Sequence, residues 1–200
     1  METLRVGRFW TNGVFSVPKQ KLLLEQIHTF FTDDMLRKTL LLFLEEDQGG
    51  LGTVSKRDMD WLVTNYSKKY EVRYKWKVKQ GWPAEIVCVH DSYHSFLRQF
   101  RRGLFDIFCR GQRVYFVMND AQYETTVGQL HFLKWAYTYG VLNYLLEHYE
   151  KIASGHRRRQ SQIRDDKKKL QGQKRKRQEL SPVKPMACEI VNSAMTLRWI

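Results

Sequence analysis

The amino-acid sequence predicts an α+β protein: a helical N-terminal unit, a small and mostly antiparallel sheet, a C-terminal helical hairpin and a basic tail without fixed structure. Apolar side chains recur at helical spacing before residue 70, alternate with basic ones over residues 72–79, and return to helical spacing after residue 129. Hydrophobic residues make up 42% of the chain, which is enough to build a core and excludes disorder along its full length.

Residues 1–70 form the helical unit of this prediction. The apolar stripe of each expected helix recurs every three or four residues, and Gly49 supplies a stop for the second. Asp58 follows Ser55 by three residues, a position that resembles the acidic end of a capping box. The expected helices run over 20–31, from Asp33 or Asp34 to about residue 48, and from Thr53 or Ser55 to about residue 66.

The most specific pattern in the body is a strand with one basic face. Apolar and basic residues alternate strictly over 72–79, so one face of a strand there is apolar and the other wholly basic. Side chains two positions apart lie about 6.6 Å apart, a spacing comparable to that of phosphates along a nucleic-acid strand. A solvated edge strand, whose lysines block pairing with other sheets, is the alternative interpretation, and the two exclude each other only in part. The candidate nucleic-acid-binding residues are Arg73, Lys75, Lys77 and Lys79, extended by Lys68 and Lys69.

The remainder of the body is expected to complete the sheet and close it with two helices. Asn119 and Asp120 suit a hairpin turn, and Asp91 or Ser92 suits a helix start. The expected strands are 85–90, 104–109, 114–118 and 123–126, and the expected helices run from residue 91 or 92 to about 103, over 129–137 and over 141–152.

Ala136 and Gly140 have the spacing of a small residue and a turn glycine in a helix-turn-helix unit. The second helix of such a unit lies in the major groove of DNA, but here Glu147 and Glu150 make its polar face slightly acidic. We therefore favour a helical hairpin that closes the core.

Positive charge is concentrated near the C-terminal end. The formal net charge is +13, of which residues 1–150 carry +3 (20 basic, 17 acidic) and residues 151–200 carry +10 (14 basic, 4 acidic). All aromatic residues except Trp199 lie at or before Tyr149. The sequence therefore predicts a globular body over 1–152 (helical over 1–70, mixed over 71–152), a basic segment without fixed structure over 153–187, and a C-terminal strand over 188–200.

Three basic clusters and one phosphorylation motif lie in this basic segment. Short clusters of lysine and arginine are read by nuclear import receptors and also neutralise phosphates without sequence preference. Ser181 precedes a proline, as in a proline-directed kinase site, and a phosphate there would add roughly −1.5 to −2 charge beside the basic run. The nuclear-import-like residues are Arg157, Arg158, Arg159, Lys167, Lys168, Lys169, Lys174, Arg175, Lys176 and Arg177.

Secretory, catalytic and metal-binding patterns are not expected from this sequence. We expect no signal peptide and no spanning helix, because no apolar run approaches the roughly 18 residues that a bilayer requires. Cys88, Cys109 and Cys188 form no CxxC pair and fit a reducing compartment. Cys88, His90 and His94 lack an obvious fourth metal ligand, and no nucleotide-binding or hydrolase motif occurs. We therefore expect no catalytic residues, no metal and no cofactor.

Two stretches resemble a family of uncharacterised proteins from large, nucleocytoplasmic DNA viruses. The first is Phe105–Gly111, and the second runs over Glu124–Ala136 and continues in Gly140–Leu142. The family has a TTVGQLNFFKWA-like segment before a helix and a basic KRKELS-like run, which Arg175–Ser181 resembles. The similarity covers roughly residues 104–181 and not the N-terminal third. The chain departs from the pattern at His131, Leu133 and Tyr137. The resemblance implies a viral context and assigns no activity.

The sequence thus predicts a non-enzymatic nucleic-acid-binding protein of viral origin, whose body positions one basic strand and whose tail adds affinity and nuclear import. The expected partners are a nucleic acid, with DNA ahead of RNA, and a nuclear import receptor, without a membrane. The expected location is the nucleus or the virion. The alternative is a structural or interaction protein, such as a virion component, whose C-terminal strand docks on a partner and whose tail contacts the genome or an acidic protein.

Overall fold

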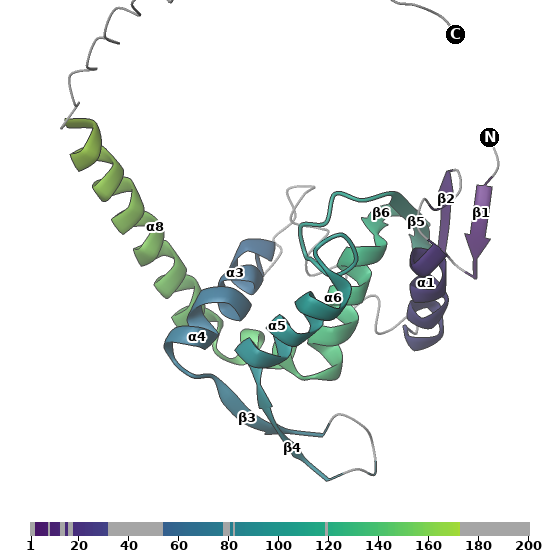
Figure 1. Cartoon of the computed structure of the whole chain (residues 1–200), viewed down its shortest axis with the longest axis horizontal. Helices are drawn as coiled ribbons and strands as arrows, with labels where there is room; N and C mark the ends of the chain where they lie inside the picture. Colours follow the sequence, from purple (N-terminus) through teal and green to yellow (C-terminus); the bar gives the residue numbers. More distant parts are fainter. Residues whose placement is uncertain are drawn as a thin grey trace, which may run out of the picture. The chain divides into compact units, whose positions relative to one another are not determined.

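The described part of the protein combines two antiparallel sheets with helices that occupy separate stretches of the chain (Figure 1). The computed structural model describes residues 3–7, 9–12, 15, 18–31, 54–77, 81, 83–118 and 120–172. The chain divides into two units, residues 1–160 and 161–200, and both sheets belong to the first. The α+β class predicted from the sequence is confirmed.

The larger sheet has four antiparallel strands in the order β1-β2-β5-β6. The hairpin predicted around residues 119 and 120 is confirmed, and Asp120 adopts a positive φ of 60° between β5 and β6. β1 and β2 are not among the elements predicted from the sequence, so the unit predicted to be helical over 1–70 begins with two strands. The strands are β1 (Thr3–Val6), β2 (Phe9–Asn12), β5 (Arg113–Met118) and β6 (Ala121–Thr126).

Two long helices pack against each other beside this sheet. α1 (Pro18–Phe30) contacts β1 and α6 (Val127–Thr138) contacts β6, and the two helices also contact each other. The helix predicted over 20–31 is confirmed as α1, whereas the helix predicted from residue 33 or 34 lies outside the described residues. The largest fully buried side chains belong to these elements and to their neighbours: Phe9, Phe31, Phe105, Phe116, Phe132 and Trp135.

The helix predicted to open at Thr53 or Ser55 is confirmed, and Ser55 is its N-cap. α3 (Lys56–Trp61) continues through a stretch of π-helix, η2 (Leu62–Tyr66), into α4 (Ser67–Lys69). The Ser55 hydroxyl accepts a hydrogen bond from the Arg57 amide at 3.0 Å, which caps the first turn. The Asp58 carboxylate does not complete a capping box. It faces α8 (Tyr149–Gly172) instead, where it accepts hydrogen bonds from Tyr149 Oη and His156 Nδ1.

The smaller sheet is a two-stranded hairpin of β3 (Arg73–Trp76) and β4 (Glu85–Cys88), followed by α5 (Val89–Phe100). The strand predicted over 85–90 therefore ends at Cys88, and the helix begins before the predicted cap at Asp91 or Ser92. The reason is that Asp91 lies inside the first turn, where a carboxylate is favoured by the helix dipole and accepts a hydrogen bond from the Cys88 thiol at 3.0 Å.

Residues 104–109 are not a strand, and the prediction of one is wrong. They form a series of tight turns, because the Asp106 carboxylate accepts a hydrogen bond from the Phe108 amide at 2.8 Å and the Asp106 carbonyl accepts one from the Cys109 amide at 3.1 Å. Phe105, Ile107 and Cys109 are nevertheless buried in alternation with more exposed neighbours. Alternating burial over residues 105–109, which is typical of a strand, is therefore produced here by a series of turns.

The turn between α6 and α7 (Val141–Glu147) depends on Gly140, which has a left-handed φ of 70°. A Cβ atom at this position would overlap the indole ring of Trp76 from β3. The turn is thus buried against the β3–β4 hairpin, in agreement with a helical hairpin that closes the core. The helix predicted over 141–152 is divided, because α7 ends at Glu147 and α8 (Tyr149–Gly172) begins after His148.

α8 corrects the prediction that the chain lacks fixed structure from residue 153. The segment is helical as far as Gly172, and the first unit extends to Gln160. Ile152 and Ala153 are buried, and the His156 ring stacks on Trp61 with ring centroids 5.5 Å apart. Arginine, lysine and glutamine lose little side-chain freedom in a helix, so the basic composition does not prevent one. Residues 173–187 and the strand predicted over 188–200 lie outside the described residues.

Candidate nucleic-acid interface

The inner face of the β3–β4 hairpin is fixed to the body by two aromatic side chains. Tyr74 Oη donates a hydrogen bond to the Tyr139 carbonyl at 3.0 Å, and Trp76 Nε1 donates one to the Thr138 carbonyl at 2.9 Å. The Tyr74 ring also stacks on Tyr144, with centroids 5.3 Å apart. The apolar half of the alternating pattern therefore determines which way β3 faces.

The outer face of β3 carries the predicted cations. Arg73 and Lys75 are exposed on this strand, and Lys77, the next residue of the alternation, is exposed just beyond its end. Lys75 lies opposite Ile86 of β4, whose side chain is 71% exposed. Lys79 lies outside the described residues. We call Arg73, Lys75 and Lys77 the basic face. The strand with one apolar and one basic face, predicted over 72–79, is confirmed for Arg73–Trp76 and is shorter than predicted, since the described residues 72 and 77 lie outside it.

Lys68 and Lys69 are exposed at the end of α4, shortly before β3 begins. Lys68 also lies near α5, because α4 and α5 contact each other. Burial lowers the pKa of the His94 ring. His90 lowers this pKa further, and so do the positive charges of Arg98 and Lys68. Positive charge therefore continues from α4 to α5.

Carboxylates also lie beside these cations: Glu71 is exposed between Lys69 and Arg73 in the chain, and Asp91 lies in the first turn of α5. Hydrogen bonds from Cys88 and His90 lower the pKa of Asp91, and the charge of Arg73 lowers it further. Cys88 and His90 both fall in the strand predicted over 85–90, but β4 ends at Cys88 and His90 lies in α5, so the two side chains do not share a strand. Within the described part of the chain, no three His, Cys, Asp or Glu side chains lie close enough together to hold a metal ion.

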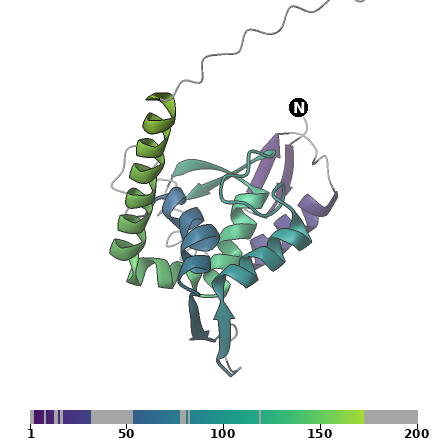
Figure 2. The same ribbon diagram turned by 60° about the vertical axis from the view of Figure 1, so that its left-hand side comes forward.

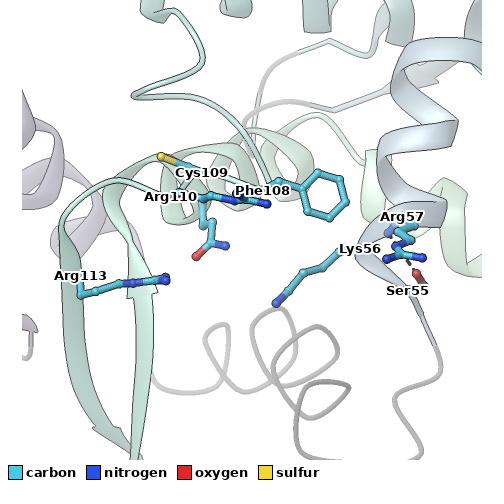
Figure 3. A pocket seen from close by; sticks show the side chains of 8 residues that line it. Ser55, Lys56, Arg57, Phe108, Cys109, Arg110 and Arg113 are labelled. Atoms are coloured by element: carbon cyan, nitrogen blue, oxygen red, sulfur yellow. Dashed lines mark hydrogen bonds between the residues drawn. The ribbon is translucent and has the colours of Figure 1, made fainter.

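A second basic feature, a cavity of about 590 Å³, was not predicted from the sequence. Lys56 and Arg57 reach it from the first turn of α3, and Arg110 and Arg113 from the opposite side (Figure 3). Phe108 also lines the cavity. These side chains come from distant parts of the sequence, so no local motif could have revealed them. We call this feature the arginine cavity.

The backbone that presents Phe108 and Arg110 is held by the start of α6. The Gln129 side-chain amide donates a hydrogen bond to the Ile107 carbonyl at 3.1 Å. Gly128 allows a close approach, because a Cβ atom there would lie 2.8 Å from the Cys109 sulfur. The two stretches on which the viral resemblance rests, Phe105–Gly111 and Glu124–Ala136, therefore pack against each other at the arginine cavity.

The predicted import clusters fall on α8 as far as they are described. Arg157, Arg158 and Arg159 lie in the first unit, and Lys167, Lys168 and Lys169 in the second, and all six are exposed. Successive residues of a helix are about 100° apart, so each triplet spreads over more than half of the helix circumference. Lys174, Arg175, Lys176, Arg177 and Ser181 lie outside the described residues.

Comparison with known proteins decides the family. Residues 10–193 match the family of unknown function DUF7197. The chain belongs to this family. The DUF7197 match begins near the N-terminus, so the similarity is wider than the span of 104–181 on which the resemblance was based and includes most of the N-terminal third.

A relative of this DUF7197 protein is the "Uncharacterized protein L507" of Acanthamoeba polyphaga mimivirus, which is 29% identical over 162 residues. The match covers 78% of this chain and 61% of the relative, so the chain spans less than two thirds of that protein's length. The relative confirms the viral context that the resemblance implied. No solved structure matches the chain. None of the described helices has the length and apolar content needed to cross a membrane.

Proposed function

We propose that this DUF7197 protein is a non-enzymatic nucleic-acid-binding protein and that the basic face of β3 contacts the phosphate backbone. The observation that carries the proposal is the division of β3 into two faces. Tyr74 and Trp76 attach the strand to the α6–α7 turn, and the alternate side chains Arg73, Lys75 and Lys77 are exposed. Because the strand is already held against the body, its row of cations can contact a row of phosphates without the entropic cost of ordering the backbone on binding.

The expected binding has weak sequence preference. Lysine and arginine side chains that contact phosphates fix the position of a protein on nucleic acid but do not read its bases. The two exposed basic clusters of α8, residues 157–159 and 167–169, would add affinity of the same kind, because each neutralised phosphate releases bound counterions. A role in nuclear import is part of this proposal, and it rests on the basic clusters of the sequence.

A binding assay with charge-matched variants tests the proposal. The full chain is titrated against labelled 20-nucleotide DNA and RNA, each single-stranded and double-stranded, and fluorescence anisotropy is recorded. We expect Lys75→Gln/Lys77→Gln to weaken binding by about tenfold or more at low salt, since it removes two phosphate contacts. The control, Lys21→Gln/Lys151→Gln, removes the same charge from exposed positions on α1 and α8.

Equal losses for the two variants would overturn the assignment to β3, because they would show that net charge alone determines affinity. Absence of binding to all four nucleic acids would overturn nucleic-acid binding itself. Comparison of the DNA and RNA titrations also tests the expectation that DNA is preferred.

A further inference from the structure

The arginine cavity is suited to a ligand that carries negative charge. Four cationic side chains line it, and no Asp or Glu is among its described lining residues. Glu124 lies close by and pairs with Arg113 at 2.9 Å, but both side chains are about half exposed, so the pair is weak and exchangeable. Arg57 and Arg110 line opposite sides of the cavity, and both side chains are exposed to solvent. Arginine side chains hold carboxylate and phosphate groups with two parallel hydrogen bonds each, so a phosphate group fits these residues.

An exposed aromatic ring accompanies these charges. Phe108 is 43% exposed, although the residues on both sides of it, Ile107 and Cys109, are buried. The hydrogen bond from its amide to Asp106 fixes the turn, so the chain holds the Phe108 ring at the cavity (Figure 3). Leaving such a ring in water is unfavourable, and planar ligands that stack on it recover the lost contact.

The remaining polar lining, Ser55 and Gln129, leaves little capacity for reading the edge of a base. The Ser55 hydroxyl already accepts a hydrogen bond from the Arg57 amide at 3.0 Å. The Gln129 side chain already donates to the Ile107 carbonyl and accepts from the Thr125 hydroxyl at 3.1 Å. Both ends of this amide are therefore engaged within the protein. A ligand in the arginine cavity would meet cations and a ring, which recognise phosphate and any base without distinguishing among bases.

We propose that the arginine cavity binds a nucleotide, with the base stacked on Phe108 and the phosphate held by Arg110 and Arg57. The nucleotide is either free or an unpaired unit of a single strand, since the bases inside a duplex present no free face for stacking. The volume of about 590 Å³ lies within the roughly 300 to 1,000 Å³ that ligand sites of this kind occupy. This site is separate from the basic face of β3, and it stands or fails independently of the function proposed above.

The test uses the full chain and three probes: a labelled 12-nucleotide oligothymidine, ATP, and inorganic pyrophosphate, which has phosphate but no base. We expect Phe108→Ala to weaken oligothymidine binding roughly 5- to 150-fold, the range found for loss of one stacked base, and Phe108→Trp to retain it. Arg110→Gln is expected to weaken it as well. Leu146→Ala is the matched control, because Leu146 is 45% exposed on α7, away from the cavity, and this variant should bind as the wild type does.

The probes separate the two sources of the nucleotide. Direct binding of ATP with the same dependence on Phe108 would identify a free nucleotide, and binding of oligothymidine alone would identify a strand; either result supports the site. The proposal is overturned if Phe108→Ala changes no affinity, if pyrophosphate binds as well as ATP and oligothymidine do, or if none of the probes binds. Lys75→Gln/Lys77→Gln should leave the effect of Phe108→Ala intact.

Discussion

His131 is a buried residue whose ionisation links the folded state to pH. Its Nδ1 atom lies 2.9 Å from the Leu104 carbonyl and donates to it in the neutral ring. Burial lowers the pKa of His131 below its ordinary value of 6.5, and the charges of Lys134 and Lys19 lower it further, whereas the Leu104 hydrogen bond raises it. The net direction is downward, so the folded protein holds the ring neutral.

This direction predicts a loss of stability in mild acid. Below pH 6.5 the unfolded chain takes up a proton on His131 that the folded chain does not, so the free energy of unfolding falls as the pH approaches the lowered folded-state pKa. We expect the urea concentration at the midpoint of unfolding to decrease when the pH is lowered from 7.5 to 5.5. The variant His131→Asn can still donate a hydrogen bond to Leu104, and we expect it to show a smaller decrease. Part of the dependence should persist, because the pKa of His94 is lowered too. An unchanged pH dependence in the variant would contradict this account.

Individual site residues differ in how well the sequence can predict them. Arg73, Lys75 and Lys77 could be placed on one face, because a two-residue period has a single geometric meaning in a strand. Phe108 and Lys56 could not be assigned to one cavity, since the contact between their segments depends on tertiary packing. Asp58 was misplaced in a capping box because local spacing says nothing about a partner as distant as His156.

Elements with a regular period are the ones that sequence reasoning recovers. α1, α3, β3 and the β5–β6 hairpin follow directly from periodicity and turn residues. Residues 104–109 show an alternation that a strand would also give, but hydrogen bonds to Asp106 turn the chain instead. Phe108 and Arg110 therefore reach the arginine cavity from a series of turns and not from a strand.

α8 is the element for which the composition was most misleading: its basic residues predicted a segment without fixed structure, and the structure shows a helix. Ile163 lies in its second half, within the second unit, and is 39% exposed. We expect Ile163→Pro to reduce the far-ultraviolet helical signal, because proline removes an amide hydrogen bond and clashes with the preceding turn. Ile163→Ala is the control and should preserve the signal. Identical spectra for the two variants would mean that this segment is not helical.

For the whole molecule, the net charge of +13 hides an uneven division. Residues 151–200 carry +10, and in the nearly balanced remainder seven of the 20 basic residues lie at two places, the basic face and the arginine cavity. Figure 2 shows the β3–β4 hairpin extending from the lower edge of the first unit. Total charge is therefore a poor guide to where this protein would contact nucleic acid. The local division of β3 into an anchored face and an exposed face is a better one.

The salt dependence of binding tests the central claim most directly. The logarithm of the association constant for duplex DNA is measured against the logarithm of the salt concentration, and each phosphate contact contributes about 0.9 to the slope. For the full chain, we predict that Lys75→Gln/Lys77→Gln has a slope shallower than wild type by roughly 1 to 2, while Lys21→Gln/Lys151→Gln keeps the wild-type slope. Equal slopes for the two double variants, or binding that does not change with salt, would contradict the claim that the basic face of β3 contacts the phosphate backbone.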